Sequence, residues 1–178
     1  MTKITSREME SCILAGGLST RMGREKARLE FRGRSLLDHA RALAEGAGLA
    51  CQVIRRDVVP RCGPLGGIIT VLRKTAARRV LFLSCDMPFV TGRLVQRLMD
   101  SGHANVFAET GGRVGFPFCL AAEALNAAEE QHAGGHFSLG AFASRLDAGR
   151  VALKGEEARQ LFNVNTPADL EAALKRGA

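Results

Sequence analysis

The chain has 178 residues, of which 46% are apolar and 24% charged, close to globular averages. This length predicts one domain over 1–178, with a single sizeable core. No apolar run approaches the roughly 18 residues that a membrane span needs, so we expect no membrane association. The polar segment 1–9 has no apolar signal-peptide core, so we interpret it as a frayed N-terminus of a cytoplasmic protein.

The net charge is +7, and arginine supplies 20 of the 25 basic residues. A positive field favours an anionic small molecule or a nucleic acid, and arginine binds phosphate through two parallel hydrogen bonds. The chain lacks Trp, Tyr and any long basic tract, which disfavours nucleic acid. The five cysteines show no C-x-x-C spacing, so the sequence predicts reduced thiols instead of disulfides or a zinc site.

Strand and helix patterns alternate along the chain. We expect strands at 11–15, 51–55, 79–85 and 150–153, a short extended piece at 28–32, and a hairpin-like pair at 105–109 and 113–120. Helices are expected at 35–44, 67–76, 91–99, 121–131, 138–146 and 167–175, with Ser35 and Thr91 as N-caps. The alternation predicts an α/β protein, a three-layer Rossmann-like fold with a mostly parallel sheet and one antiparallel strand.

A glycine-rich basic loop follows the first expected strand, from Leu14 and Ala15 through Gly16 and Gly17 to Lys26. Glycines let the backbone approach a ligand closely, and successive free N–H groups form a hollow that binds anions. Arg21 and Lys26 add full charges, so the loop suits a polyphosphate. It matches neither G-x-x-x-x-G-K-[ST] nor G-x-G-x-x-G. A tight turn with solvated arginines is the plainer alternative.

A carboxylate, Asp86, directly follows the apolar run 79–85, and Pro88 stops that strand. Mg²⁺ prefers one or two carboxylates together with substrate phosphate oxygens, so Asp86 is a candidate magnesium ligand. The alternative is an Asx turn or a helix cap. Carboxyl ends of parallel strands meet at one edge of a sheet, which should bring Asp86 and the glycine loop together.

Three weaker features complete the set. A rigid turn is expected at Gly63, Pro64 and Leu65, and its backbone could pass close to a flat base. The alternative is an ordinary loop before a helix. Asp57 could accept hydrogen bonds from ribose hydroxyls. The segments 115–118 and 163–167 carry less information, since Asn and Thr before Pro167 are ordinary capping residues.

Four motifs occur in order: Leu14-Ala15-Gly16-Gly17-x-Ser19-x-Arg21-Met22-Gly23-x-x-Lys26, Gly63-Pro64-Leu65-x-Gly67, Cys85-Asp86-Met87-Pro88 and Asn163-Val164-Asn165-Thr166-Pro167-x-Asp169-Leu170. Together they resemble the molybdenum cofactor guanylyltransferase family of Rossmann-like nucleotidyltransferases, over about residues 11–174. The resemblance implies transfer of GMP from GTP, with Mg²⁺, to the terminal phosphate of molybdenum-carrying molybdopterin, with release of pyrophosphate.

The resemblance also implies residue roles. Leu14, Ala15, Gly16, Gly17, Asp57, Gly63, Pro64 and Leu65 would contact the nucleotide, Lys26 its phosphates, and Asp86 would hold Mg²⁺. Arg21 and Lys26 would stabilise the charge that grows on pyrophosphate. Asn163 and Asn165 would lie on the pterin side. Molybdoenzymes or cofactor-insertion proteins would be further partners.

One segment departs from the family. Only 30 residues separate Lys26 from Asp57, and no Asn lies between Ala27 and Arg56, where the family has an asparagine near the base. Two alternatives therefore stay open at this point. One is a nucleotidyltransferase with another acceptor, such as a sugar phosphate, and the other is a non-catalytic protein that binds nucleotide or cofactor.

Overall fold

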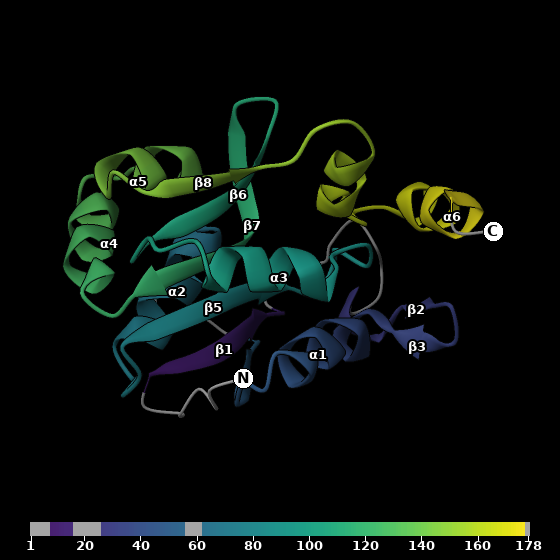
Figure 1. The fold of residues 1–178 in the computed structure, drawn as a ribbon, viewed down its shortest axis with the longest axis horizontal. Helices are drawn as coiled ribbons and strands as arrows, with labels where there is room; N and C mark the ends of the chain where they lie inside the picture. The colour runs from purple at the N-terminus through teal and green to yellow at the C-terminus, as the bar shows by residue number, and fades with distance from the viewer. Residues whose placement is uncertain (1–7, 16–25, 56–61, 177–178) are drawn as a thin grey trace.

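The computed structural model describes residues 8–15, 26–55 and 62–176. Its centre is a six-stranded sheet with the strand order β4-β1-β5-β7-β6-β8 (Figure 1). The strands are β1 (Met9–Leu14), β4 (Cys51–Ile54), β5 (Arg79–Ser84), β6 (Val106–Thr110), β7 (Arg113–Ala121) and β8 (Gly149–Ala152). β7 pairs antiparallel with both neighbours, while the other described ladders of this sheet are parallel. This confirms the predicted sheet and its single antiparallel strand.

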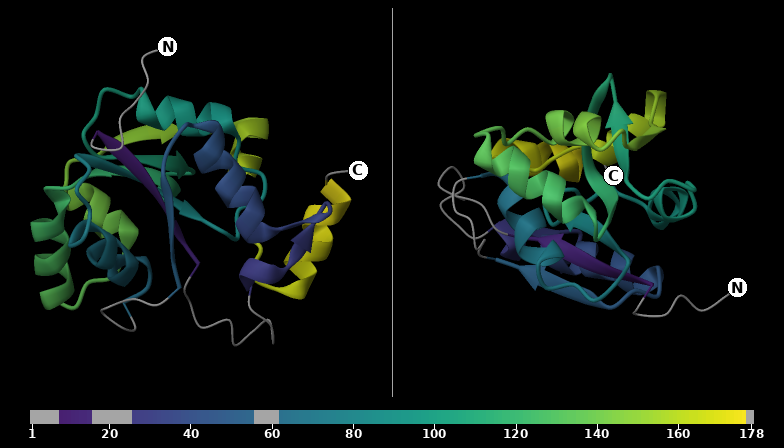
Figure 2. Two further views of the ribbon diagram at one scale, coloured as in Figure 1. Left: turned by 90° about the horizontal axis from the view of Figure 1, so that it is seen from below. Right: turned by 90° about the vertical axis from the view of Figure 1, so that its left-hand side faces the viewer.

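Helices cover both faces of the sheet, which makes three layers (Figure 2). The helices are α1 (Leu36–Gly46), α2 (Pro64–Leu72), α3 (Gly92–Met99), α4 (Ala124–Ala133), α5 (Leu139–Arg145) and α6 (Pro167–Arg176), with short 3-10 turns η2 (Lys26–Arg28) and η3 (Gly155–Leu161). α1 and α3 pack on one face, and α2, α4 and α5 pack on the other. Within the described ranges, no helix is long and apolar enough to cross a membrane.

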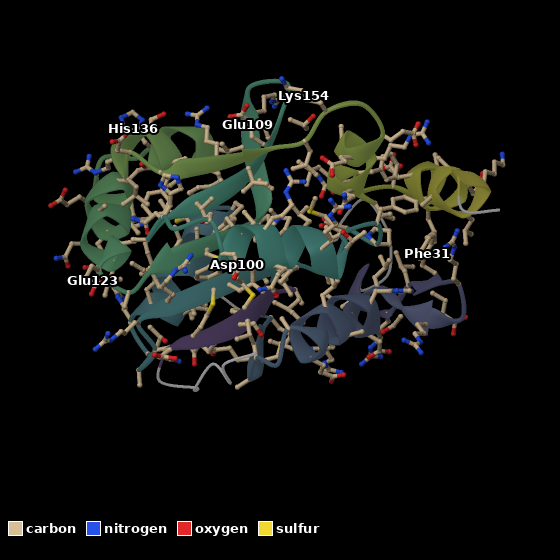
Figure 3. The ribbon with its side chains drawn as sticks, viewed as in Figure 1. Phe31, Asp100, Glu109, Glu123, His136 and Lys154 are labelled. Carbon is tan, nitrogen blue, oxygen red and sulfur yellow. The ribbon has the colours of Figure 1, made fainter. Side chains whose placement is uncertain are left out.

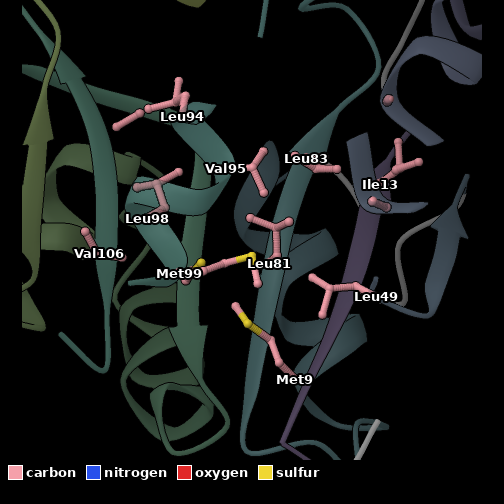
Figure 4. Packing of buried hydrophobic residues seen from close by; sticks show 14 of the residues in the cluster. Met9, Ile13, Leu49, Leu81, Leu83, Leu94, Val95, Leu98, Met99 and Val106 are labelled. Atoms are coloured by element: carbon pink, nitrogen blue, oxygen red, sulfur yellow. The ribbon is translucent and has the colours of Figure 1, made fainter. Parts of the chain in front are cut away.

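Strand alternation divides the core into two apolar clusters, because successive side chains of a strand point to opposite faces. In β5, Leu81 and Leu83 pack toward α1 and α3, whereas Val80 and Phe82 pack toward α2 and its neighbours. Figure 4 shows the first cluster, where Leu94, Val95, Leu98 and Met99 of α3 lie against these strands. A run that is apolar at every position, such as 80–83, is typical of a strand buried on both faces.

A small hairpin and α6 form a third cluster beside the sheet. β2 (Glu30–Phe31) and β3 (Arg34–Ser35) pair antiparallel across a two-residue turn. Both turn residues have positive φ, 50° at Arg32 and 76° at Gly33, as a hairpin of type I′ requires. Phe31, Leu36, Val164 and Ala173 are buried together, which joins the hairpin to α6.

The expected helix caps are confirmed. The Ser35 hydroxyl accepts the N–H of Asp38 at 3.1 Å, and the Thr91 hydroxyl accepts the N–H of Leu94 at 3.3 Å. The expected start of the next helix at residue 67 was wrong, because α2 begins at Pro64. Proline fits the first helical position, where its missing N–H costs nothing, so the segment 64–67 is the first turn of a helix and not a loop.

The five cysteines are thiols and form no disulfide, and Cys12, Cys62, Cys85 and Cys119 are buried. Cys51 is exposed. Burial raises the pKa of the Cys119 thiol to about 12. This thiol is therefore neutral at physiological pH and acts as a core residue.

Phe118 is the central ring of the second cluster, fully buried and stacked on both Phe82 and Phe107. We expect Phe118→Ala to lower the free energy of unfolding by about 3–5 kcal/mol, because it leaves a cavity in a packed interior. Urea unfolding followed by circular dichroism measures this change. Phe137→Ala is the control: its side chain is 40% exposed, and the loss there should stay below about 1 kcal/mol. Equal losses in the two variants would contradict the core assignment.

Candidate functional site

Three strands end together at the carboxyl edge of the sheet. Leu14 lies opposite both Ile54 and Ser84, so the last residues of β1, β4 and β5 are in register. The N–H of Ala15 donates to the carbonyl of Ile54 at 2.9 Å, which extends this pairing by one residue. The entrance to the glycine loop and the segment that carries Asp86 therefore leave the sheet side by side, as the sequence predicts.

Asp86 is half-buried at this edge and is held from two sides. The Ser84 hydroxyl donates to its carboxylate atom Oδ1 at 2.6 Å, a short charge-assisted hydrogen bond. The N–H of Val164 donates to the Asp86 carbonyl at 2.8 Å. The first contact orients the carboxylate, and the second brings the motif at 163–167 to the same place.

Asn163 and Asn165 are exposed, and they flank Val164, which is fully buried. The Asp169 carboxylate accepts the N–H of Asn165 at 2.9 Å and the N–H of Thr166 at 2.8 Å. The Thr166 hydroxyl accepts the N–H of Asp169 at 3.1 Å, which completes a reciprocal cap of α6. The turn that presents both asparagines is therefore fixed at its middle and at its end.

The N-terminus of α2 lies at the same edge, because the chain must return from the end of β4 to the start of β5. Gly63 precedes it with φ of 55°, a conformation that suits glycine. The first-turn N–H groups give this end partial positive charge. Leu65 is fully buried, so only its backbone can face a ligand. Gly63 is exposed and Pro64 half-buried, so both can face one directly.

Several predicted site residues lie outside the described parts of the chain: Gly16, Gly17, Arg21 and Asp57. Lys26 opens η2, and its backbone is described although its side chain is not. The next residue, Ala27, is 2% exposed and packs with the α1 and α3 cluster. This contact fixes the backbone from which Lys26 extends.

Asp86 has the chemistry that Mg²⁺ requires. The ion is commonly held by one or two carboxylates while substrate phosphates supply further oxygens. Asp86 offers an oriented carboxylate at the edge where the predicted phosphate loop begins. Within the described residues, no three His, Cys, Asp or Glu side chains gather as a metal cage.

Ser84 is a residue of the candidate site that the sequence reasoning missed. Its hydroxyl holds the Asp86 carboxylate. A hydroxyl two residues before a carboxylate that follows a strand was the available signal, because the side chains of Ser84 and Asp86 are close enough in sequence to form a hydrogen bond.

Known proteins match this chain over most of its length. The family model of the MobA-like NTP transferase domain matches residues 11–55 and 41–148. A molybdenum cofactor guanylyltransferase from Xanthomonas euvesicatoria pv. vesicatoria is 33% identical over 177 residues, covering 90% of this chain and 92% of the relative.

Solved structures share the fold. Molybdopterin-guanine dinucleotide biosynthesis protein A from Archaeoglobus fulgidus has a TM-score of 0.71 at 20% identity, covering 94% of this chain and 98% of that one. The 2-C-methyl-D-erythritol 4-phosphate cytidylyltransferase from Thermus thermophilus has a TM-score of 0.69 at 18% identity, covering 95% and 98%. At these identities the likeness shows the architecture alone.

The α6 cap gives a local test of the site. Asp169→Ala removes the acceptor of two backbone N–H groups, so the free energy of unfolding should fall by about 1 kcal/mol. The amides of Asn165 and Thr166 should exchange hydrogen faster in this variant. Exchange followed by NMR and urea unfolding measure both effects. Glu171→Ala, on the same helix and exposed, should change neither, and similar behaviour of the two variants would contradict the capping role.

Proposed function

The chain belongs to the family of MobA-like NTP transferase domains, and from that premise we propose that it transfers GMP from Mg-GTP to the terminal phosphate of molybdenum-loaded molybdopterin. An acceptor phosphate oxygen forms a bond to the α-phosphorus of GTP. The bond between the α-phosphorus and the bridging oxygen to the β-phosphate breaks, and pyrophosphate leaves with the electron pair. The product is the guanine dinucleotide form of the cofactor.

This reaction needs positioning and charge neutralisation, and no nucleophile from the protein. Main-chain amides of the segment 16–17, with Arg21 and Lys26, are assigned to the triphosphate and to the charge that grows on pyrophosphate. Asp86 would hold Mg²⁺, which neutralises phosphate charge when bound. Asp57, with Leu14, Ala15 and the turn at 63–65, is assigned to the nucleoside, and Asn163 and Asn165 to the pterin side.

One observation carries the proposal. The backbone hydrogen bond from Val164 to Asp86 joins two distant motifs at the edge of the sheet where β1 ends. The hydrogen bond from the Ser84 hydroxyl orients the Asp86 carboxylate at the same edge. A donor nucleotide over that edge and an acceptor beside the asparagines would meet at the carboxylate. The relatives named molybdenum cofactor guanylyltransferase support this choice of acceptor.

The decisive experiment measures pyrophosphate release with GTP, CTP, ATP or UTP, each with molybdopterin as acceptor. Turnover with GTP alone supports the proposal. Turnover only with a sugar phosphate acceptor would replace it, and nucleotide binding without turnover would indicate an accessory protein.

Two charged side chains test the assigned mechanism. Lys26→Ala and Asp86→Ala should each lower kcat at least ~100-fold, because each removes a charge contact used in the transition state. Initial rates of pyrophosphate release at saturating GTP measure this loss. Lys74→Ala and Asp100→Ala are matched controls, since both residues follow helices that return to the opposite edge of the sheet. A near-normal rate in either site variant would refute the role of that residue.

A further inference from the structure

The aromatic side chain of Phe116 on β7 is partly exposed beside the candidate site. The ladder between β6 and β7 pairs Phe107 with Phe118 and then Ala108 with Gly115, so Phe116 and Pro117 are extra residues in a bulge. Phe116 is half-buried, and its ring centroid lies 4.7 Å from that of Phe118. Phe118 in turn stacks on Phe107 at 4.7 Å and is fully buried. The Phe116 ring is therefore supported on one side by a rigid stack and is partly open to solvent.

A carboxylate lies on the same face of this hairpin. Glu109 pairs with Val114, two residues from Phe116, and alternation puts Glu109 on the face of Phe107. Val114 and Phe116 both pack against the second apolar cluster, which confirms that they share this face. Figure 3 labels Glu109 on the hairpin that projects from the sheet.

The Glu109 carboxylate is partly shielded from solvent and is paired through one of its oxygens. The Glu109 side chain is only 18% exposed, and Arg150 donates to its atom Oε2 at 2.9 Å. Atom Oε1 has no hydrogen-bond partner among the described residues. Oε1 does not belong to the buried side-chain atoms that lack a partner, so it is accessible from solvent. Oε1 is therefore a ready acceptor for a donor from a ligand.

Phe116 also lies on the side of the sheet that Asp86 faces. The ladder between β5 and β7 ends at Phe82 and Phe118, and Ser84 and Phe116 are each two residues further toward the carboxyl edge. Ser84 shares the face of Phe82 by alternation, and it bonds the Asp86 carboxylate. The same face of the sheet therefore carries Phe116 and Ser84, and Asp86 lies next to Ser84 at the carboxyl edge.

We propose that Phe116 and Glu109 bind a flat 2-amino-4-oxopyrimidine ring of a substrate, with the ring stacked on Phe116 and its adjacent N–H donors directed to Glu109. Stacking on an aromatic side chain accepts many flat rings, whereas a carboxylate selects neighbouring N–H donors through charge-assisted bonds. Guanine and pterin share this ring, so the inference rests on the proposed function, and the two substrates are distinguished by titration.

The test uses Glu109→Gln and Phe116→Leu in the full chain. Glutamine keeps the size of the side chain but removes its charge, and leucine keeps the packing but removes the aromatic face. Titration calorimetry gives Kd for Mg-GTP, Mg-ATP and 6-hydroxymethylpterin, and initial rates give KM for molybdopterin. We expect each variant to weaken the binding of one ring-bearing ligand about tenfold or more, with the affinity for Mg-ATP unchanged. Glu123→Gln and Phe137→Leu, distant in the fold, are the matched controls.

Each outcome decides the proposal. A weaker Kd for GTP alone assigns the ring to guanine, and a weaker Kd for the free pterin with a raised KM for molybdopterin assigns it to the acceptor. Wild-type affinity of both variants for both ligands overturns the proposal, as does a wild-type protein that binds neither. If the wild type binds these ligands but releases no pyrophosphate, the proposed reaction fails while the same titrations still decide the binding site.

Discussion

The hydrogen bond from the Val164 amide to the Asp86 carbonyl joins the C-terminal motif to the end of β5. Aromatic packing stabilises this connection. The ring of Phe31 packs edge-on against that of Phe89, with centroids 5.5 Å apart, and Phe89 packs against Phe162, with centroids 6.1 Å apart. Because Val164 and Phe31 are buried in one cluster, the hairpin, the Asp86 loop and α6 hold one another. Without this contact the exposed asparagines would have no fixed distance to the carboxylate.

Strand alternation gives the site its sidedness. Ser84 and Asp86 are two residues apart and hydrogen-bonded, and Cys85 between them points into the opposite cluster. Leu14 packs with the second cluster, the one that α2 covers. The end of β1, the N-terminus of α2 and the carboxylate therefore approach one side of the carboxyl edge, which a parallel β-α-β connection produces without any dedicated scaffold.

Sequence patterns predicted the features that depend on a few neighbouring residues. The apolar run 80–83, the hydroxyl caps Ser35 and Thr91, and the hairpin glycines each act over a few residues, and the structure has the expected elements there. The start of α2 was missed because two consecutive glycines, at 66 and 67, are typical of a loop. The proline at 64 favours the first position of a helix and was the signal for the earlier start. The order of the strands and the contact of Val164 with Asp86 could not be predicted from the residues alone, because 78 positions separate those partners.

The shortened segment between Lys26 and Asp57 bears on how a base is distinguished. Its described part holds η2, the small hairpin, α1 and then β4, which is an outer strand of the sheet. The hairpin packs with α6, and the part of this segment that the structure describes holds no asparagine and no strand beyond β2, β3 and β4. The contacts proposed for Leu14 and for the turn at 63–65 with the nucleoside lie on the α2 side of the sheet. Within the described chain, the backbone before α2, the half-buried Leu14 and the Glu109 carboxylate are the groups with suitable chemistry there. In the proposed role the Glu109 carboxylate selects a ring with adjacent N–H donors, because a ring without them leaves its second oxygen without a partner.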